Sequence, residues 1–162
     1  MIGVTDPKIT LDALMLADIE HLRRWRNADI SSYRTPYRVT PAMQQAFYDT
    51  VLSNRQSDHR YWAILLDEPK PGVVAGIGLL AGMVGLGPIQ WENGLAEISL
   101  VVAPEMRRQG VGREAVRLVL LEGFDRMRLA TIYGECYHNN PAQPFWEAIT
   151  TTYGGSLTTL PR

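Results

Sequence analysis

Apolar residues recur along the chain with two different spacings, which divide it into strands and helices. Short runs rich in apolar residues are typical of strands, whereas apolar residues three and four positions apart are typical of helices. The predicted strands are 9–14, 60–66, 73–84, 95–102, 129–137 and 156–160. The predicted helices are 17–27, 41–54, 110–127 and 141–152, and Thr40-Pro41 marks one start as an N-cap followed by a first-turn proline.

The predicted order is therefore β-α-α-β-β-β-α-β-α-β. Three strands follow one another in the middle of the chain, which favours a mixed sheet over an all-parallel one. We therefore predict an α+β fold built on a mixed sheet. A length of 162 residues suits one domain, and no linker divides the sequence, so a single domain spanning 1–162 is expected.

Composition and charge narrow the class of protein. The formal net charge of −1 argues against a nucleic-acid partner, because nucleic-acid binders usually carry a basic excess. No apolar run approaches the ~20 residues that span a membrane, and the N-terminus lacks a signal-peptide pattern. Cys136 is the only cysteine, so a reducing compartment is the simplest interpretation, and we expect a cytoplasmic protein. Cys136 and the three histidines lack metal-ligand spacing, so no metal is expected.

A basic loop at 107–112 joins the strand 95–102 to the helix that follows it. The first turn of a helix has unpaired N–H groups and the positive end of its dipole, and glycines let an anion approach the backbone. Arg107 and Arg108 add positive charge. This combination predicts a pyrophosphate site, and the alternative is a plain turn whose arginines are solvated.

The same loop resembles a known signature. The string Arg107-x-x-Gly110-x-Gly112 matches the Arg/Gln-x-x-Gly-x-Gly/Ala signature of the GNAT N-acetyltransferase superfamily. The longer string 96–112, with Trp25-Arg26-Asn27, resembles the ribosomal-protein alanine acetyltransferase-like branch of that superfamily, in which the early helix shapes the acceptor pocket. The resemblance implies a GNAT fold and transfer of the acetyl group of acetyl-CoA to a primary amine by direct attack in a ternary complex.

The resemblance also implies which residues hold the co-substrate, acetyl-CoA. Backbone amides of the loop would bind the pyrophosphate, and the end of the preceding strand would pair with the pantetheine arm. The residues implied are Leu100, Val101, Val102, Arg107, Arg108, Gln109, Gly110, Val111, Gly112 and Asn139.

Glu97 is the candidate general base. An alkyl amine has a pKa near ~10 and must lose a proton before it attacks. Glu97 lies in an otherwise apolar strand, where burial would raise the pKa of its carboxyl, and it matches a glutamate that serves as base in some family members. The alternative is a surface or salt-bridged glutamate.

The general acid is less clear from the sequence. The family often has a tyrosine in the string Asn-x-x-Ala-x-x-Phe-Tyr, but here the matching string begins at Asn139 and ends in Trp146, whose indole cannot usefully give up a proton. Tyr137 and His138 lie just upstream and are the substitute candidates. Cys136 is expected to be a buried core residue rather than a nucleophile.

The remaining polar residues suggest surface positions or an acceptor pocket. We expect His21 and His59 at the surface. An aromatic and basic loop either lines the acceptor pocket or is simply solvated, and its residues are Tyr33, Arg34, Tyr37 and Arg38.

Two other functions compete with an acetyltransferase. One is a non-catalytic CoA-binding or interaction module with the same fold. Trp146, which stands in place of the usual tyrosine, supports this alternative. The other is a dinucleotide-binding fold, because Gly110-x-Gly112-x-x-Ala115 fits that pattern, although about six residues separate the first glycine from the strand.

The resemblance implies a small-molecule amine or a protein N-terminus as the acceptor, and the net charge does not choose between them. The family usually adds a seventh strand beyond the sixth, whereas this sequence ends at Arg162. We therefore expect either a truncated chain or a sheet edge completed by a partner subunit, which makes a homodimer possible.

Overall fold

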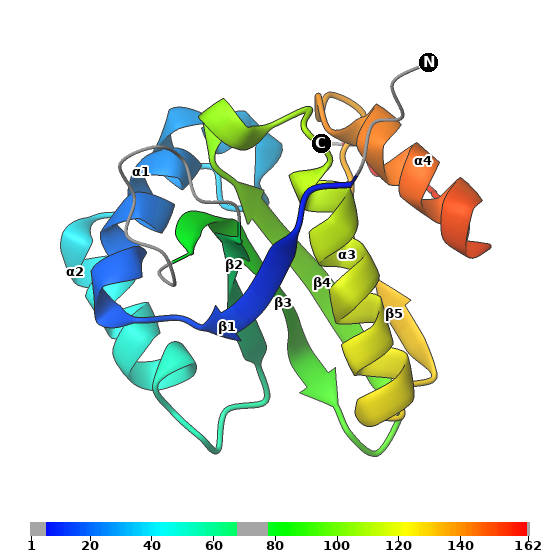
Figure 1. The fold of residues 1–162 in the computed structure, drawn as a ribbon, viewed down its shortest axis with the longest axis horizontal. Helices are drawn as coiled ribbons and strands as arrows, with labels where there is room; N and C mark the ends of the chain where they lie inside the picture. Colours follow the sequence, from blue (N-terminus) through cyan, green and yellow to red (C-terminus); the bar gives the residue numbers. More distant parts are fainter. Residues whose placement is uncertain (1–5, 68–77, 162) are drawn as a thin grey trace.

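The computed structural model describes residues 6–67 and 78–161. A five-stranded sheet with the order β1-β2-β3-β4-β5 forms its centre (Figure 1). Strands β1 to β4 pair antiparallel with their neighbours, and β4 pairs in parallel with β5. The predicted mixed sheet and α+β class are therefore confirmed. The strands are β1 (Ile9–Ala13), β2 (Arg60–Leu66), β3 (Leu79–Gln90), β4 (Leu95–Val102) and β5 (Thr131–Tyr133).

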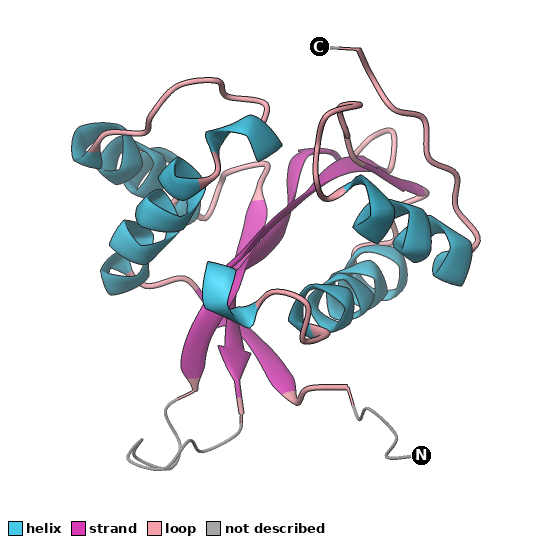
Figure 2. Cartoon of the chain, turned by 90° about the horizontal axis from the view of Figure 1, so that it is seen from above, coloured by secondary structure: helices cyan, strands magenta, loops and turns pink. Residues whose placement is uncertain are grey.

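Helices cover both faces of the sheet, with α1 and α2 on one side and α3 and α4 on the other (Figure 2). The helices are α1 (Ile19–Ala28), α2 (Pro41–Phe47), α3 (Val111–Leu121) and α4 (Gln143–Tyr153). Short π-helical segments continue α2 to Leu52 and α3 to Arg126. The predicted start of α2 is confirmed, because Thr40 Oγ1 accepts a hydrogen bond from the Met43 N–H at 3.2 Å.

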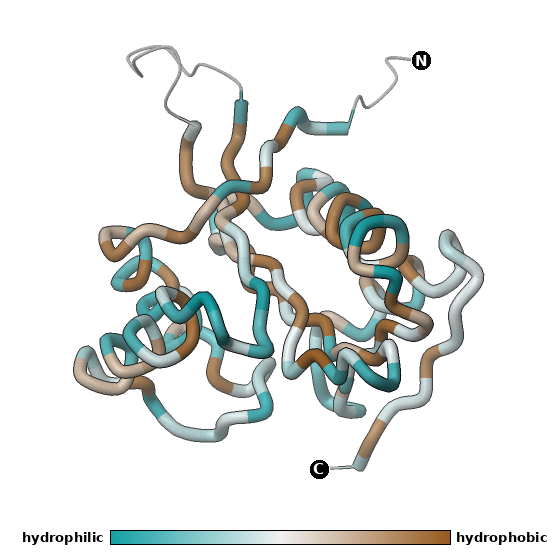
Figure 3. Tube along the Cα trace, turned by 90° about the horizontal axis from the view of Figure 1, so that it is seen from below, coloured by the Kyte–Doolittle hydropathy of each residue, from teal (hydrophilic) through white to brown (hydrophobic). Residues whose placement is uncertain are grey.

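Each face of the sheet has its own apolar core, since side chains along a strand point alternately to opposite faces. The hydrophobic segments of the trace gather where helices and sheet meet (Figure 3). The core under α3 includes Ile64, Val84, Leu86, Val111 and Val119. The core under α1 includes Leu14, Leu22, Ala63, Met83 and Val101. Because Glu97 and Ser99 alternate in step with Val101, their side chains share the α1 face of β4.

The third strand differs from its prediction, which ended the strand at residue 84. Strand β3 continues to Gln90. Two glycines in this extension make room for rings on the neighbouring strand. A Cβ on Gly85 would lie 2.0 Å from Tyr61 Cδ1, and a Cβ on Gly87 would lie 2.2 Å from His59 Cδ2. Residues 73–77 of the predicted strand lie outside the described residues.

The C-terminal part of the predicted sheet is also wrong. Strand β5 is limited to Thr131–Tyr133, although 129–137 was predicted. The predicted strand 156–160 is replaced, in the described chain, by a single bridge between Tyr137 and Leu160. Apolar content indicated strands in both segments, but β5 leaves the sheet before it pairs with the second half of β4.

Candidate active site

The pairing between β4 and β5 ends halfway along β4. Only three positions pair, Leu95 with Thr131, Ala96 with Ile132, and Glu97 with Tyr133. Strand β4 then continues to Val102 beside β3 alone. The second half of β4 therefore presents one edge that β5 does not cover.

Backbone direction decides which residues of β4 face this uncovered edge. The Ala103 N–H donates to Ala81 O of β3 at 2.8 Å, and Gly94 O accepts from the Ala130 N–H at 2.7 Å on the other side. Backbone groups alternate between the two sides of a strand. Those of Leu100 and Val102 therefore point away from β3. Those of Val101 point toward β3, and its side chain is buried in the core under α1.

Gly110 shapes the N-terminus of α3. It is the N-cap residue of the helix, with φ +81°, and no side-chain hydrogen bond from the described residues caps the helix there. A Cβ at Gly110 would lie 3.0 Å from Pro7 Cδ, so both the backbone conformation and the space require glycine. At Gly112 a Cβ would lie 3.4 Å from Phe145 Cε2, which is an ordinary van der Waals contact between α3 and α4. The helix mouth thus presents uncapped N–H groups, which fit an anionic pyrophosphate.

The side chains of the loop have different positions. Arg107 bonds within the protein, with Nε 3.3 Å from Val102 O and Nη1 3.3 Å from Asp29 Oδ2. Gln109 Nε2 donates to a backbone carbonyl, Glu105 O, at 2.7 Å. Arg108 is exposed with φ 61°, and the Val111 side chain is buried in the core. Arg108 is therefore the arginine placed to meet a ligand in solution, while Arg107 braces the end of β4.

Glu97 lies at the last paired position of β4, and only 15% of its side chain is exposed. Burial raises the pKa of its carboxyl, as expected. The Arg34 guanidinium lowers that pKa and the nearby Glu135 carboxylate raises it, and the balance lies above the ordinary value. Arg34 pairs with Glu97 and also with Glu135 Oε2, at 2.8 Å. Glu97 is therefore largely buried, as predicted, and also salt-bridged, as in the alternative interpretation, while its role as a base stays a prediction.

Tyr61 is a site neighbour that the sequence analysis missed. It lies on β2, its ring crosses the strand β3 above Gly85, and its hydroxyl shares a hydrogen bond with Ser99 on β4. Burial raises the pKa of Tyr61, more than the bond to Ser99 lowers it. The signal was Gly85 itself, because a glycine within a central strand often marks a close approach from a neighbour.

Three candidates precede α4. Tyr137 forms the bridge to Leu160, and His138 Nδ1 lies 2.8 Å from Thr159 Oγ1 in the C-terminal segment. Cys136 is 2% exposed, which confirms the predicted core cysteine.

Asn140, rather than Asn139, is the buried asparagine of this segment. Asn140 Nδ2 donates to Ser32 O at 3.1 Å and its Oδ1 accepts from the Ala142 N–H at 2.8 Å. It therefore ties the start of α4 to the segment after α1. Asn139 is exposed. Because the two asparagines are adjacent, the sequence alone does not indicate which of them is buried.

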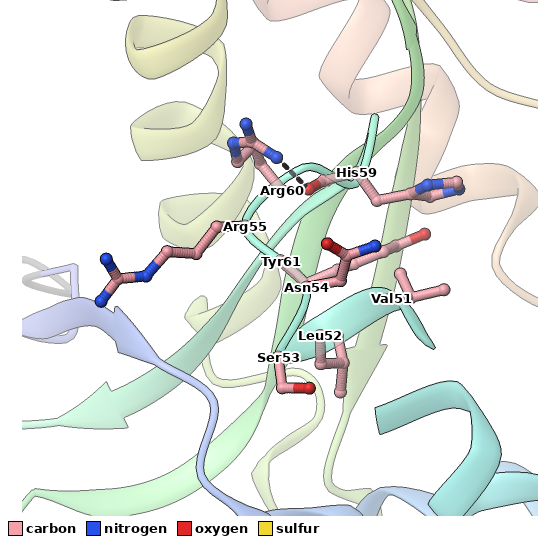
Figure 4. Close-up of a pocket in the computed structure, with 8 residues that line it drawn as sticks. All are labelled: Val51, Leu52, Ser53, Asn54, Arg55, His59, Arg60 and Tyr61. Atoms are coloured by element: carbon pink, nitrogen blue, oxygen red, sulfur yellow. Dashed lines mark hydrogen bonds between the residues drawn. The ribbon is translucent and has the colours of Figure 1, made fainter. Parts of the chain in front are cut away.

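The expectation for the histidines is half right. His21 is exposed, but His59 is only 24% exposed at its side chain. The His59 ring stacks on Tyr61 at 5.7 Å between centroids, and Nδ1 lies 2.7 Å from Asp58 Oδ1. Both rings border a pocket of 260 Å³ at the end of the α2 segment (Figure 4). Its lining residues are Val51, Leu52, Ser53, Asn54, Arg55, His59, Arg60 and Tyr61.

The loop 33–39 is anchored by α1. Asn27 holds the backbone of Val39 with two bonds, each 2.8 Å long, and Arg26 Nη2 donates to Thr35 Oγ1 at 2.7 Å. Tyr33 is half-buried against the core under α1, whereas Tyr37 and Arg38 are exposed. The backbone of the loop that contains Arg34 is thus held in place by these hydrogen bonds.

Residues 6–67 and 78–161 contain no group of three or more His, Cys, Asp or Glu side chains that could hold a metal ion. Within the same residues, no helix has the length and apolar character needed to cross a membrane.

Comparison with known families decides the identity of this fold. The family described as the acetyltransferase (GNAT) domain matches residues 8–143. The chain belongs to the GNAT acetyltransferase family. By its family, this GNAT protein is an acetyltransferase. The matched span includes β1 to β5, α1 to α3 and the helix mouth at Gly110.

Solved structures agree with this fold. Spermidine N-acetyltransferase from Vibrio cholerae in complex with CoA and spermine has a TM-score of 0.69 and 24% identity, over 87% of this chain and 79% of that one. The dodecameric form of the same Vibrio cholerae enzyme in an intermediate state has a TM-score of 0.66 and 24% identity, over 87% and 77% of the chains. At such identity the likeness establishes the fold alone. No curated protein matches the chain.

Proposed function

We propose that this GNAT enzyme acetylates the primary amine of a small cationic molecule, using acetyl-CoA, by direct attack in a ternary complex. The observation that carries the proposal is the largely buried Glu97 carboxylate where the β4–β5 pairing ends. The exposed second carboxylate of Glu135 nearby favours a cationic acceptor. The similar enzyme from Vibrio cholerae is a spermidine N-acetyltransferase that was solved with spermine, which supports the polyamines as the first acceptors to test.

The helix mouth and the uncovered edge of β4 would hold acetyl-CoA. N–H groups of residues 108–112 would bind the pyrophosphate, with Arg108 adding charge. Backbone groups of Leu100 and Val102 would pair with the pantetheine arm, whereas those of Val101 pair with β3 and would not contact it. Acetyl-CoA supplies a thioester carbonyl, and an N–H of this edge would stabilise the charge that develops on the carbonyl oxygen.

Glu97 would accept the proton of the acceptor ammonium, which has a pKa near ~10 in water. The thiol of CoA resembles that of cysteine, with a pKa near ~8.5, so its departure needs modest help from an acid. Tyr137 lies within electrostatic reach of Arg34 and hence on the Glu97 side. This position favours Tyr137 over His138, whose imidazole contacts Thr159. Asn139 would contact the arm from the exposed turn before α4.

A protein N-terminus is the second acceptor candidate. The string 96–112 resembles the ribosomal-protein alanine acetyltransferase-like branch, which favours an N-terminal alanine. Strand β5 lies at the edge of the described sheet, and a sheet edge that a partner subunit could complete also favours a homodimer. Sedimentation at several protein concentrations would measure it, and a strictly monomeric species would rule it out.

The test is a thiol-release assay with acetyl-CoA against spermidine, spermine, small monoamines and a peptide that begins with alanine. We expect turnover with a polyamine, and a loss of about 10²–10⁴-fold in kcat for Glu97→Gln. The matched control is Glu92→Gln, since Glu92 is exposed in the turn after β3. Equal rates for Glu97→Gln and wild type would reject the base. CoA binding in calorimetry with no thiol release from any amine would favour a non-catalytic module.

A further inference from the structure

One guanidinium connects three segments that are far apart in the sequence. Arg34 extends from the loop 33–39 and pairs with Glu97, the last residue of β4 that pairs with β5. It also pairs with Glu135, two residues beyond the end of β5, at 2.8 Å. Arg34 therefore links the two strands at the position where their direct pairing ends.

This arrangement differs from an ordinary surface ion pair. Exposed pairs contribute little because water and salt screen them and because both side chains lose freedom. Here only 15% of the Glu97 side chain is exposed, against 54% for Arg34 and 37% for Glu135. The planar fork of an arginine can serve two carboxylates at once, which a lysine does less well. The buried carboxylate therefore has a fixed cationic partner.

Hydrogen bonds hold the backbone on both sides of Arg34. Asn27 clamps the backbone of Val39 at one end, and Arg26 bonds Thr35 next to Arg34. Asn140 bonds the carbonyl of Ser32 on the other side. These bonds hold the backbone on both sides of Arg34, from which its side chain reaches the two carboxylates.

We propose that Arg34 is a positioning residue that fixes the Glu97 carboxylate at the end of the β4–β5 pairing and, in opposition to Glu135, sets the pH range in which Glu97 takes up a proton. The proposal rests on the proposed role of Glu97 as the base. Glu135 acts on Glu97 in the opposite sense to Arg34, because it is a like charge. The loop 33–39 and the segment after β5 thereby both influence proton uptake by the Glu97 carboxylate on β4.

The charged and titratable groups around Glu97 come from every neighbouring segment. They are Arg34 from the loop, Glu135 and Tyr137 from the segment after β5, and Tyr61 from β2. Burial raises the pKa of Glu97, Arg34 lowers it and Glu135 raises it. Removing Arg34 must therefore raise the pH at which the Glu97 carboxyl is half protonated, and neutralising Glu135 must lower it.

The test combines two measurements on the full-length protein. Carboxyl ¹³C signals of labelled glutamate, with Glu97 assigned through Glu97→Gln, give the titration midpoint without any ligand. The pH profile of kcat/KM with the best amine of the thiol-release panel gives the kinetic counterpart. The variants are Arg34→Gln, Arg34→Lys and Glu135→Gln, with Arg38→Gln as control because Arg38 is exposed in the same loop.

We expect Arg34→Gln to move the NMR titration midpoint of Glu97 and the acidic limb of the kcat/KM profile to higher pH. Glu135→Gln should move both to lower pH. Arg34→Lys should stay closer to wild type than Arg34→Gln, and Arg38→Gln should not differ from wild type. Shifts of the same sign in Arg34→Gln and Glu135→Gln, or an unmoved midpoint in Arg34→Gln, would overturn the proposal. A purely structural role would lower activity or melting temperature without opposite shifts.

Failure of the proposed function is distinguishable from failure of this inference. If Glu97→Gln remains fully active while the NMR midpoints still move in opposite directions, Arg34 controls Glu97 but Glu97 is not the base. If Glu97→Gln is inactive and the midpoints do not move, the base is correct and the role of Arg34 is wrong.

Discussion

Replacing Asn27 by alanine tests how the loop 33–39 is held in place. Its amide makes two bonds of 2.8 Å with the backbone of Val39, which is 7% exposed. In Asn27→Ala the Val39 carbonyl retains Arg23 Nη1 at 3.2 Å, but the Val39 N–H loses its partner. A buried group without a partner costs about 1–3 kcal/mol, and a lost hydrogen bond about 0.5–1.5 kcal/mol. Since Arg23 offsets part of the second cost, we expect a net loss of about 2–3 kcal/mol.

At this chain length each kcal/mol lowers the melting temperature by roughly 2–4 °C, so the variant should melt roughly 4–12 °C lower. Urea unfolding followed by circular dichroism would measure the free energy directly. The matched control is Asn93→Ala, whose amide bonds only an exposed side chain, that of Gln90, and which should change stability by less than about 0.5 kcal/mol. An Asn27→Ala protein as stable as the Asn93→Ala protein would show that the two bonds between Asn27 and Val39 do not hold the loop.

The other two predictions concern glycines. Gly110→Ala should lose about 1–2 kcal/mol of stability, because φ is +81°, and should also weaken CoA binding in calorimetry. Gly154→Ala has the same backbone strain at φ +76° with nothing within 4 Å of the new Cβ, so an equal loss of CoA affinity there would reject a site at Gly110. Gly85→Ala should lose about 1–3 kcal/mol in urea unfolding, since its Cβ would lie 2.0 Å from Tyr61 Cδ1 and 2.7 Å from Arg60 O. The control, Gly155→Ala, has its nearest contact at 3.4 Å, and a similar loss there would reject the steric clash at Gly85 as the cause.

The sequence determined those parts of the fold that depend on local pattern. The bounds of β2 and β4 were predicted to the residue, because both are apolar runs bounded by polar or turn residues. The N-cap at Thr40 and the helix after Gly110 were also predicted, since capping depends on a few adjacent residues. The signature at Arg107 is equally local, so the family could be recognised before the fold was known.

Only the tertiary structure decided which distant residues meet. Arg34 and Glu97 are 63 positions apart, and no periodicity connects a loop arginine with a strand glutamate. The predicted strand ended before Gly85, but in the structure the strand continues and the ring of Tyr61 from another strand occupies the space above Gly85. The early end of β5 likewise depends on how the chain returns to the sheet. Local propensities act over a few residues, whereas burial and charge act between any segments that the fold brings together, and these long-range contacts define the environment of Glu97.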